Sequence, residues 1–342
     1  MGLRLMKRGQ VFASVLICTH NRSGLLSEAL QSLAQTRTTL PWELVLVDNG
    51  SRDDTRRIVA QHAAGFPVPL RYVFEPRLGK SIALNTGIGR AAGQVIVFGD
   101  DDQRFAEDWV ERSCAALIAD PDIDYTGGPV LPLAPSVLPR WLDLEHSEYR
   151  SPLGVVDYGT EPFIFEERKR IAGGGNMAVR RTLLDRIGGF SDHLGRRGRS
   201  LLGQEQAEFF SRSRAAGARG AFVPDMRVWH HVPPERLHRR YFLRWWYWKG
   251  IGHARWHAMA GCTEYGLDMK NVSRIAGVPR FVFGEAARAL LDAVARRPRA
   301  SDAPARLLPL LRLAYLAGYA VEALLRSGRP LPLANLRAAA GS

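Results

Sequence analysis

The chain has 342 residues, of which 46% are hydrophobic and 24% are charged, and its 47 basic and 34 acidic residues give a formal net charge of +13. This composition excludes a disordered chain and predicts a packed core, either in one large α/β domain with an appendage or in two smaller domains. The charge favours anionic partners such as nucleic acid, anionic lipid or phosphorylated substrates, although a compositional bias toward Arg would also produce it.

The cysteines exclude two other classes of protein. Cys18, Cys114 and Cys262 are odd in number and far apart, and no Cys-x-x-Cys or Cys/His spacing links them. Neither a disulfide framework nor a zinc site is indicated, and a reducing cytoplasm is expected. The apolar stretch 11–18 follows basic residues as in a signal peptide, but it lacks a small-residue cleavage site and is predicted to be the first β-strand.

The first hundred residues alternate short apolar runs with helical patterns. The predicted strands are residues 11–18, 42–48, 70–74 and 95–99, and the predicted helices are residues 23–35, 53–64 and 81–92. Strands that are apolar throughout and separated by helices imply a mainly parallel sheet of βαβ units. Such sheets bind ligands at the carboxyl ends of their strands.

Polar residues close each of the four predicted strands, which solvation alone does not explain. They are Thr19-His20-Asn21-Arg22, Asp48-Asn49-Gly50-Ser51, Glu75-Pro76-Arg77 and Asp100-Asp101-Asp102. Because parallel strands end at one edge of a sheet, these side chains are expected to line one site.

The second half of the chain is less regular. Residues 123–166 are rich in Pro and Gly and have no assignment, whereas 173–175 is a Gly-rich loop that enters a strand. A helix is predicted over 203–216, and a strand over 221–232 with a proline inside, which places that strand at an edge or bend. Beyond the Pro233-Pro234 pair only helical patterns occur, so the expected domains are 1–234 and 235–342.

The acidic triplet Asp100-Asp101-Asp102 points to a metal. Three adjacent carboxylates at a strand end repel one another, and Mg²⁺ or Mn²⁺ is the natural partner because hard cations take carboxylate and phosphate oxygens together. The alternative is an acidic cluster at the start of the helix predicted over 105–119, where negative charge is favourable.

The order of the motifs resembles that of the family 2 glycosyltransferases over roughly the first 235 residues. The matching segments are Cys18-Thr19-His20-Asn21-Arg22, Val47-Asp48-Asn49-Gly50-Ser51, Gly79-Lys80-Ser81 with Ala83-Leu84-Asn85-Thr86-Gly87, and Asp100-Asp101-Asp102. The resemblance implies the α/β GT-A nucleotide-diphospho-sugar transferase fold, a Rossmann-like, mostly parallel sheet flanked by helices, here with a helical C-terminal extension. It also implies an inverting enzyme with a nucleotide-sugar donor.

The resemblance also implies a donor site. Thr19 and Asp48 match positions that contact the nucleotide, with Asp48 accepting from the base, and Asp100 matches one that contacts the ribose. Asp102 would hold the metal that bridges the two phosphates and neutralises charge on the leaving nucleoside diphosphate. The other residues expected around the nucleotide and its diphosphate are Asn21, Arg22, Arg77, Lys80 and Asp101.

Other matches complete the expected site. Glu205 in Gly203-Gln204-Glu205 corresponds to the catalytic base, although it would also suit a helix N-terminus. The loop of Gly174, Gly175 and Asn176 resembles the acceptor or donor-sugar loop. His230, preferred to its neighbour His231, resembles a late metal or phosphate ligand, while a lone His is more often structural.

One residue of the family pattern is missing. Ala83-Leu84-Asn85 lacks an expected arginine, so Lys80, Arg77 or the basic segment 195–199 would supply that charge.

The C-terminal part is basic and aromatic. Residues 227–260 hold seven Lys or Arg and one acidic residue, Glu235, together with seven Trp, Tyr or Phe side chains between Tyr241 and Trp256. These residues suit an anionic membrane surface or a packed junction between helices and domain. Residues 306–326 are apolar but interrupted by Pro309, Arg312 and Glu322, which predicts an amphipathic helix lying on a membrane or a partner rather than a span.

The favoured interpretation is a cytoplasmic glycosyltransferase at the inner face of the membrane. It would move a sugar from a UDP-linked donor to a hydroxyl of a glycan or lipid-linked acceptor in cell-envelope polysaccharide synthesis, with Mg²⁺ or Mn²⁺ and no nucleic acid. A nucleotidyltransferase would need a Gly-rich, basic triphosphate loop after the first strand. A non-catalytic membrane-associated anion-binding protein leaves the acidic edge unexplained, and a nicotinamide enzyme lacks its glycine motif after a strand.

Overall fold

The computed structural model describes residues 11–133, 138–165, 170–198, 200–263, 266–295 and 304–326. The chain forms two compact units. The first, here the sheet unit, comprises Met1–Leu133, Gly154–Asp192 and Phe209–His231, and the second, the helical unit, comprises Ala134–Leu153, His193–Glu208 and Val232–Ser342. Residues 134–153, 193–208 and 232–234 thus belong to the helical unit, and the contiguous division at residue 234 stays a prediction.

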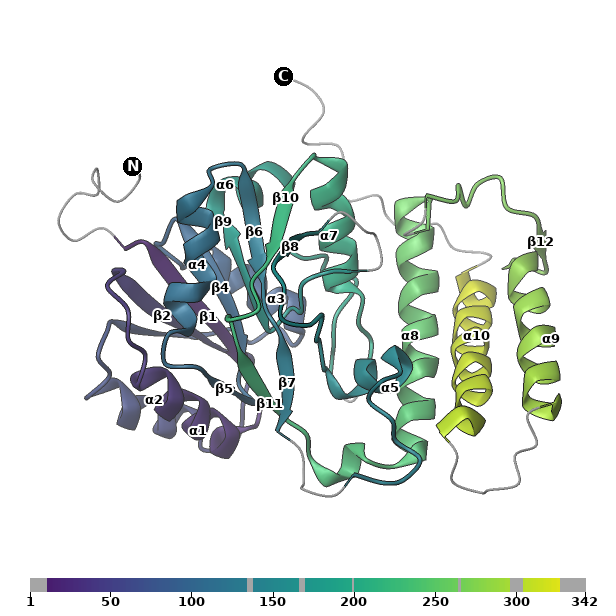
Figure 1. The fold of residues 1–342 in the computed structure, drawn as a ribbon, viewed down its shortest axis with the longest axis horizontal. Coiled ribbons are helices and arrows are strands. Elements are labelled where there is room, and N and C mark those ends of the chain that lie inside the picture. Colours follow the sequence, from purple (N-terminus) through teal and green to yellow (C-terminus); the bar gives the residue numbers. More distant parts are fainter. Residues whose placement is uncertain are drawn as a thin grey trace. The chain divides into compact units, whose positions relative to one another are not determined.

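The sheet unit is built on an eight-stranded sheet (Figure 1) in the order β3-β2-β1-β4-β9-β6-β10-β8. Its strands are β1 (Ala13–Thr19), β2 (Trp42–Asp48), β3 (Leu70–Phe74), β4 (Val95–Asp100), β6 (Ile123–Gly127), β8 (Phe163–Ile164), β9 (Asn176–Arg180) and β10 (Arg219–Phe222). The first four strands are parallel, as predicted, and β9 runs antiparallel between β4 and β6. The four N-terminal strands therefore deliver their carboxyl ends to one edge.

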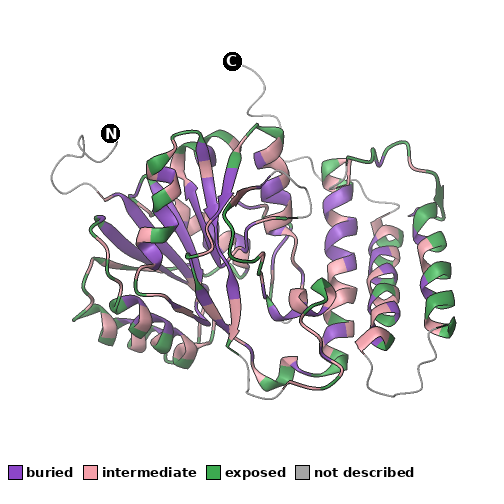
Figure 2. Ribbon diagram, in the orientation of Figure 1, coloured by how far each residue is buried: buried purple, intermediate pink, exposed green. Residues whose placement is uncertain are grey.

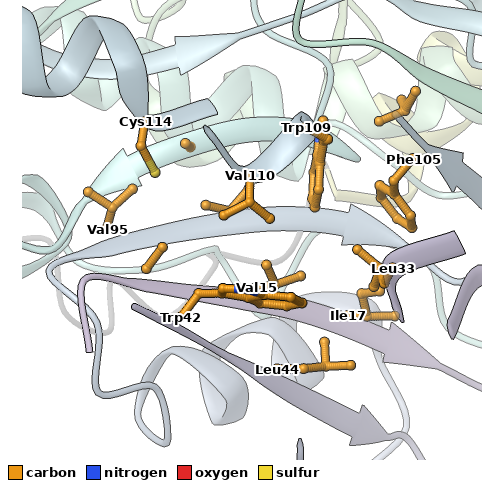
Figure 3. Close-up of a cluster of buried hydrophobic side chains, with 14 of the residues drawn as sticks. Val15, Ile17, Leu33, Trp42, Leu44, Val95, Phe105, Trp109, Val110 and Cys114 are labelled. Carbon is orange, nitrogen blue, oxygen red and sulfur yellow. The ribbon is translucent and has the colours of Figure 1, made fainter. Parts of the chain in front are cut away.

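Apolar clusters cover both faces of this sheet. Alternate residues of β1 point to opposite faces, so Val15 and Ile17 join one cluster while Leu16 joins the other. Figure 3 shows the first cluster, in which Trp109 and Val110 of α4 (Trp109–Ala119) lie over strand residues. Burial of each such side chain contributes about 1.5–3 kcal/mol.

Six helices accompany these strands. They are α1 (Ser23–Ala34), α2 (Thr55–Ala63), α3 (Lys80–Ile88), α4 (Trp109–Ala119), α6 (Arg181–Ile187) and α7 (Glu205–Ala215). The first three confirm the predicted helices to within four residues at each end. The helix α7 begins in the helical unit and enters the sheet unit at Phe209.

A second, three-stranded sheet corrects two predictions. It consists of β5 (Gln103–Phe105), β11 (Val228–His231) and β7 (Val130–Leu133). The helix predicted from residue 105 starts at Trp109, because residues 103–105 pair with β11 instead. The strand predicted over 221–232 is two strands, β10 and β11, in different sheets, and Pro224 lies in the break because it has no N–H for a ladder.

The helical unit contains α5 (Ser147–Arg150), α8 (Arg239–Ala260), α9 (Arg280–Ala295) and α10 (Leu307–Arg326), with a small hairpin of β12 (Arg274–Ile275) and β13 (Val278–Pro279). In Figure 1 the helix α10 lies between α8 and α9. The backbones of α8 and α10 touch, since a Cβ atom on Gly250 would lie 1.9 Å from the carbonyl oxygen of Tyr315. A Cβ atom on Gly318 would lie equally close, 1.9 Å, to that of Tyr247. Both glycines are therefore required by the crossing.

The helix α10 meets the length and composition criteria for a membrane span, which the sequence argument had denied. Among the described residues, Pro304–Arg326 is long and apolar enough to cross a membrane by length and composition, with a mean hydropathy of 1.4 over the best window and 39% of that window buried in the protein. Core helices of soluble proteins meet the same test, so this is weak evidence for a span. The three interrupting residues do not exclude one, contrary to the sequence argument.

Candidate active site

The polar residues that close β1, β2 and β4 come together as predicted. Parallel pairing sets Thr19 beside Asp48 and Cys18 beside Asp100. The N-terminus of α3 adds Lys80, whose Nζ lies 2.9 Å from Oδ1 of Asp100. The strand ends thus form one charged edge.

Two carboxylates of the acidic triplet are buried and share one cation. Nη1 of Arg22 lies 3.0 Å from Oδ1 of Asp101 and 2.8 Å from Oδ2 of Asp102. The hydroxyl of Thr19 donates to Oδ2 of Asp101 at 2.7 Å. Asp101 and Asp102 are 4% and 5% exposed, and both are therefore held at the site rather than solvated.

The electrostatics favour a further cation at the triplet. Burial raises the pKa of Asp101 above its ordinary value, against the lowering effect of Arg22, and the charge of Asp102 raises it further. Burial opposes the charge on Arg22, but the carboxylates of Asp101 and Asp102 raise its pKa. Three carboxylates therefore face the two basic groups of Arg22 and Lys80.

Asp102 and His230 are the residues that fit a divalent metal. Nε2 of His230 lies 3.5 Å from Oδ2 of Asp102, and His230 is 7% exposed. Adjacent ligands of an ion with bonds near 2.1 Å lie roughly 3 Å apart, so the pair has nearly the spacing of two ligands. The part of the chain that the structure describes has no group of three or more His, Cys, Asp or Glu suited to a metal. An ion here would thus take its other ligands from phosphate and water, as Mg²⁺ commonly does.

The strand β11 explains how His230 reaches the triplet. His230 is in register with Gln103 of β5, and the backbone N–H of His231 donates to the carbonyl of Asp102 at 2.8 Å. The left-handed Gly154 lies against the His230 ring, where a Cβ atom would be 3.3 Å from Cε1. His231, in contrast, is only half-buried.

The Gly-rich loop lies directly against the triplet. A Cβ atom on Gly175 would be 2.3 Å from Oδ2 of Asp100 and 2.6 Å from Nε2 of Gln103, so a larger residue would displace these two side chains. Asn176 is fully buried: its Oδ1 accepts from Nε1 of Trp109 at 2.8 Å and its Nδ2 donates to two backbone carbonyls. The Asn176 side chain thus anchors the loop.

The β2 end is held by its own hydrogen bonds. Oδ1 of Asp48 accepts from the N–H of Ser51 and Oδ2 accepts from the hydroxyl of Tyr72, each at 2.8 Å. Burial and this bond raise the pKa of Tyr72. Asp48 is 2% exposed, so a bound base would have to use its remaining lone pairs.

Two other predicted donor residues have local partners. Asn21 adopts a left-handed conformation, and its Oδ1 accepts from the N–H of Arg52 at 2.7 Å. Arg77 is paired with the buried Glu75, and this pairing lowers the pKa of Glu75 to about 2. The Arg77 side chain is 70% exposed and is the more accessible partner. The basic segment 195–199 is described except for residue 199.

Glu205 lies in the helical unit, whereas the other predicted site residues lie in the sheet unit. It is the first residue of α7 and is 6% exposed. Its Oε2 is buried and has no hydrogen-bond partner among the described residues. A buried carboxylate oxygen without a donor is costly unless a ligand supplies one.

The sequence did not single out several residues that support the site. Gln103 is 1% exposed, and its Oε1 accepts from the N–H of Asp100 at 3.0 Å. Trp109 donates a hydrogen bond to Asn176, and Tyr72 donates one to Asp48. Their only signal was a position beside a motif residue, or on a neighbouring strand, because hydrogen bonds between distant segments leave no local pattern.

Comparisons with known proteins point to one family. A family model described as "Glycosyl transferase family 2" matches residues 14–188. Glycosyltransferase AglE of Haloferax volcanii is 25% identical over 187 residues, covering 54% of this chain and 57% of AglE. Succinoglycan biosynthesis protein ExoM of Rhizobium meliloti is 26% identical over 296 residues, covering 83% of this chain and 86% of ExoM.

A solved structure shows the same fold. The mannosyltransferase PcManGT from Pyrobaculum calidifontis, in complex with GDP-Man and Mn²⁺, aligns with a TM-score of 0.59 at 21% identity. The alignment covers 94% of this chain and 89% of that chain. The match spans only about half the length of AglE, so the substrates of that whole protein are not assigned to this chain.

Proposed function

Because this chain belongs to glycosyl transferase family 2, we propose that it moves a sugar from a UDP-linked donor to a hydroxyl of a glycan or lipid-linked acceptor, with inversion. It is a glycosyltransferase with the GT-A fold expected from its sequence. The observation that carries the proposed mechanism is the buried Oε2 of Glu205, which has no hydrogen-bond partner among the described residues. A buried, unsatisfied carboxylate is suited to accept a proton from an acceptor hydroxyl.

The reaction is a direct displacement at the anomeric carbon. Glu205 removes the proton of the acceptor hydroxyl while that oxygen forms a bond to the anomeric carbon. The bond from this carbon to the β-phosphate oxygen breaks, and its electron pair leaves with the nucleoside diphosphate. Because attack and departure occur on opposite faces, the anomeric configuration inverts.

The charged edge of the sheet would bind the donor. Thr19, Asp48 and Asp100 would contact the nucleoside, and the basic side chains of Arg22 and Lys80 would face the diphosphate. The other proposed contacts are those of Asn21, Arg77 and Asp101 with the nucleotide, and those of Gly174, Gly175 and Asn176 with the sugar or acceptor.

Asp102 and His230 would hold Mg²⁺ or Mn²⁺, in keeping with their 3.5 Å separation and their burial. The metal, when bound, neutralises negative charge on the leaving diphosphate. In this proposal Arg22 balances Asp101 and would share Asp102 with the ion, because its Nη1 lies 2.8 Å from Oδ2 of Asp102.

The function is tested by nucleotide release from a panel of sugar nucleotides, with Mn²⁺ and with a chelator. Glu205→Gln should retain UDP binding while its turnover falls about 10²–10⁴-fold, the usual contribution of a general base. Wild-type turnover in Glu205→Gln would reject Glu205 as the base. Metal-independent turnover that survives Asp102→Asn would reject Asp102 as the metal ligand.

We also propose that the helical unit attaches the enzyme peripherally to the inner, cytoplasmic face of an anionic membrane. Exposed apolar side chains support this: on α9 Phe283, Leu290, Leu291 and Val294 are 47–70% exposed, and on α10 Leu310, Val321 and Leu324 are 38–48% exposed. At 100° per residue each set falls within an arc of about 100°. Apolar stripes of this size on a chain of +13 charge favour a surface that is both apolar and anionic.

A further inference from the structure

The residue before Glu205 has an unusual backbone. Gln204 has φ = 80°, and it is one of three described non-glycine residues with positive φ. A long side chain rarely adopts this left-handed region, so the surrounding structure must hold it there. Because Gln204 joins directly to Glu205, its φ and ψ set the direction in which α7 begins and hence the position of the Glu205 carboxylate.

His253 of α8 holds the Gln204 side chain. Its Nε2 lies 2.8 Å from Oε1 of Gln204 and its Nδ1 lies 2.7 Å from the hydroxyl of Tyr315 on α10. An amide oxygen only accepts, so Nε2 carries a proton, and in the neutral ring Nδ1 accepts from the hydroxyl of Tyr315. His253 is 9% exposed, and both ring nitrogens are therefore used inside the protein.

The glycine beside His253 allows this contact. A Cβ atom on Gly252 would lie 2.9 Å from Cγ of Gln204 and 3.3 Å from the carbonyl oxygen of Gly203. The 203–204 segment therefore rests on α8, with its side chain tied to His253. All of these residues belong to the helical unit.

We propose that His253 is a positioning residue for the transfer reaction. Its hydrogen bond fixes Gln204 in the left-handed conformation, which presents the Glu205 carboxylate to the acceptor. This inference rests on the proposed role of Glu205 as the base. Loss of the bond would let Gln204 relax toward negative φ and displace Glu205, and a displacement of about 1 Å at a reacting group costs on the order of 10²-fold in rate.

A double-mutant cycle with Gln204→Gly separates this role from simple stability. Glycine adopts positive φ without strain, so a chain with Gln204→Gly does not need His253 to hold that conformation. We expect His253→Ala to lower kcat for UDP release about 10- to 100-fold in the wild-type background. In the Gln204→Gly background the same change should lower kcat less than about threefold.

The readouts are kcat for the UDP-sugar hydrolysed fastest by the wild-type full chain, and the Kd of UDP with Mn²⁺. Kd should stay within about twofold of the wild-type value in every variant, because the donor residues lie elsewhere. His257→Ala is the matched control: His257 lies one turn further along α8, is 4% exposed, and its Nδ1 lies 3.1 Å from the hydroxyl of Tyr319. It should leave kcat unchanged.

Two results would overturn the proposal. One is a wild-type kcat in His253→Ala, and the other is an equal loss of kcat in both backgrounds, which marks His253 as merely structural. Glu205→Gln is measured in parallel. If it turns over like the wild type, the base itself is misassigned; if it is inactive while His253→Ala is fully active, only the positioning role fails.

Discussion

Arg22 is the residue on which the charge balance of the triplet depends. It is the cation that lies within 3.0 Å of both Asp101 and Asp102, and its side chain is 35% exposed. It occupies an oxygen of Asp102 that a metal would also use. If Asp102 holds the proposed ion, Arg22 and that ion would compete for the same carboxylate, and replacing Arg22 should change how the protein responds to metal.

Arg22→Gln should lower the free energy of unfolding by about 1–3 kcal/mol without metal, because it leaves a buried carboxylate pair without its cation. Mn²⁺ bound at the proposed site would favour the folded state, so it should raise Tm, and it should raise it more in the variant than in the wild type. Thermal unfolding with and without Mn²⁺ measures both effects.

The matched control is Arg57→Gln. Arg57 pairs with Asp54 on the surface, where the two side chains are 57% and 65% exposed, and such pairs contribute about 0–1 kcal/mol. Its Mn²⁺ response should equal that of the wild type. Equal Mn²⁺ shifts in Arg22→Gln and the wild type would contradict the competition.

At the scale of elements, the crossing of α8 and α10 requires glycine at the points where the two backbones touch. Gly318 meets the backbone of Tyr247, whereas Gly284 on α9 has nothing within 4 Å of the position of a Cβ atom. Gly318→Ala should destabilise the protein by about 1–3 kcal/mol or more, because the added carbon collides with a carbonyl that cannot move freely. Urea unfolding, with fluorescence of the tryptophans of α8 as the probe, measures the change.

Gly284→Ala is expected to change the stability in the opposite direction. It adds the same methyl group to a helix of the same unit, but in open space, so it should stabilise the protein by up to about 1 kcal/mol through helix propensity. If both variants lost stability equally, the close backbone contact at Gly318 would not be the cause.

The elements also show what a single sequence can predict. The strands 42–48 and 70–74 were predicted at their observed ends, since unbroken apolar runs bounded by turn residues depend on local composition alone. The short strand Gln103–Phe105 was not predicted, and its last residue was assigned to the helix expected over 105–119. It exists because β11, more than a hundred residues later, supplies its hydrogen bonds, and no local pattern reveals such a partner.

For the molecule as a whole, the sequence predicted which polar residues meet at the strand ends better than it predicted which segments form each unit. Thr19, Asp48 and Asp100 are the last residues of the neighbouring parallel strands β1, β2 and β4, so topology alone brings them together. The assignment of 134–153 and 193–208 to the helical unit depends on tertiary contacts, which leave no trace in composition. The bond between Gln204 and His253, which links one of these segments to α8, was missed for the same reason.

The proposed membrane attachment concerns the whole molecule because it depends both on the net charge of +13 and on the apolar stripes of α9 and α10. Figure 2 shows α9 exposed along much of its length. The full chain should co-sediment with vesicles containing an anionic phospholipid and bind neutral vesicles more weakly. Binding should fall as salt rises from about 0.05 to 0.5 M, because salt screens the Lys and Arg charges.

Variants test which surface makes the contact. Leu291→Glu with Val294→Glu places two charges in the α9 stripe, where the side chains are 70% and 64% exposed, and should reduce vesicle binding at least about tenfold. Phe74→Glu, on β3 of the sheet unit and 55% exposed, adds one charge outside the stripe and should reduce it far less. Equal recovery in the supernatant with and without vesicles would refute attachment. Retention in cell membranes after salt and alkaline carbonate washes would refute peripheral attachment and identify α10 as a true span, since a helix that crosses the bilayer is not released by screening its charges.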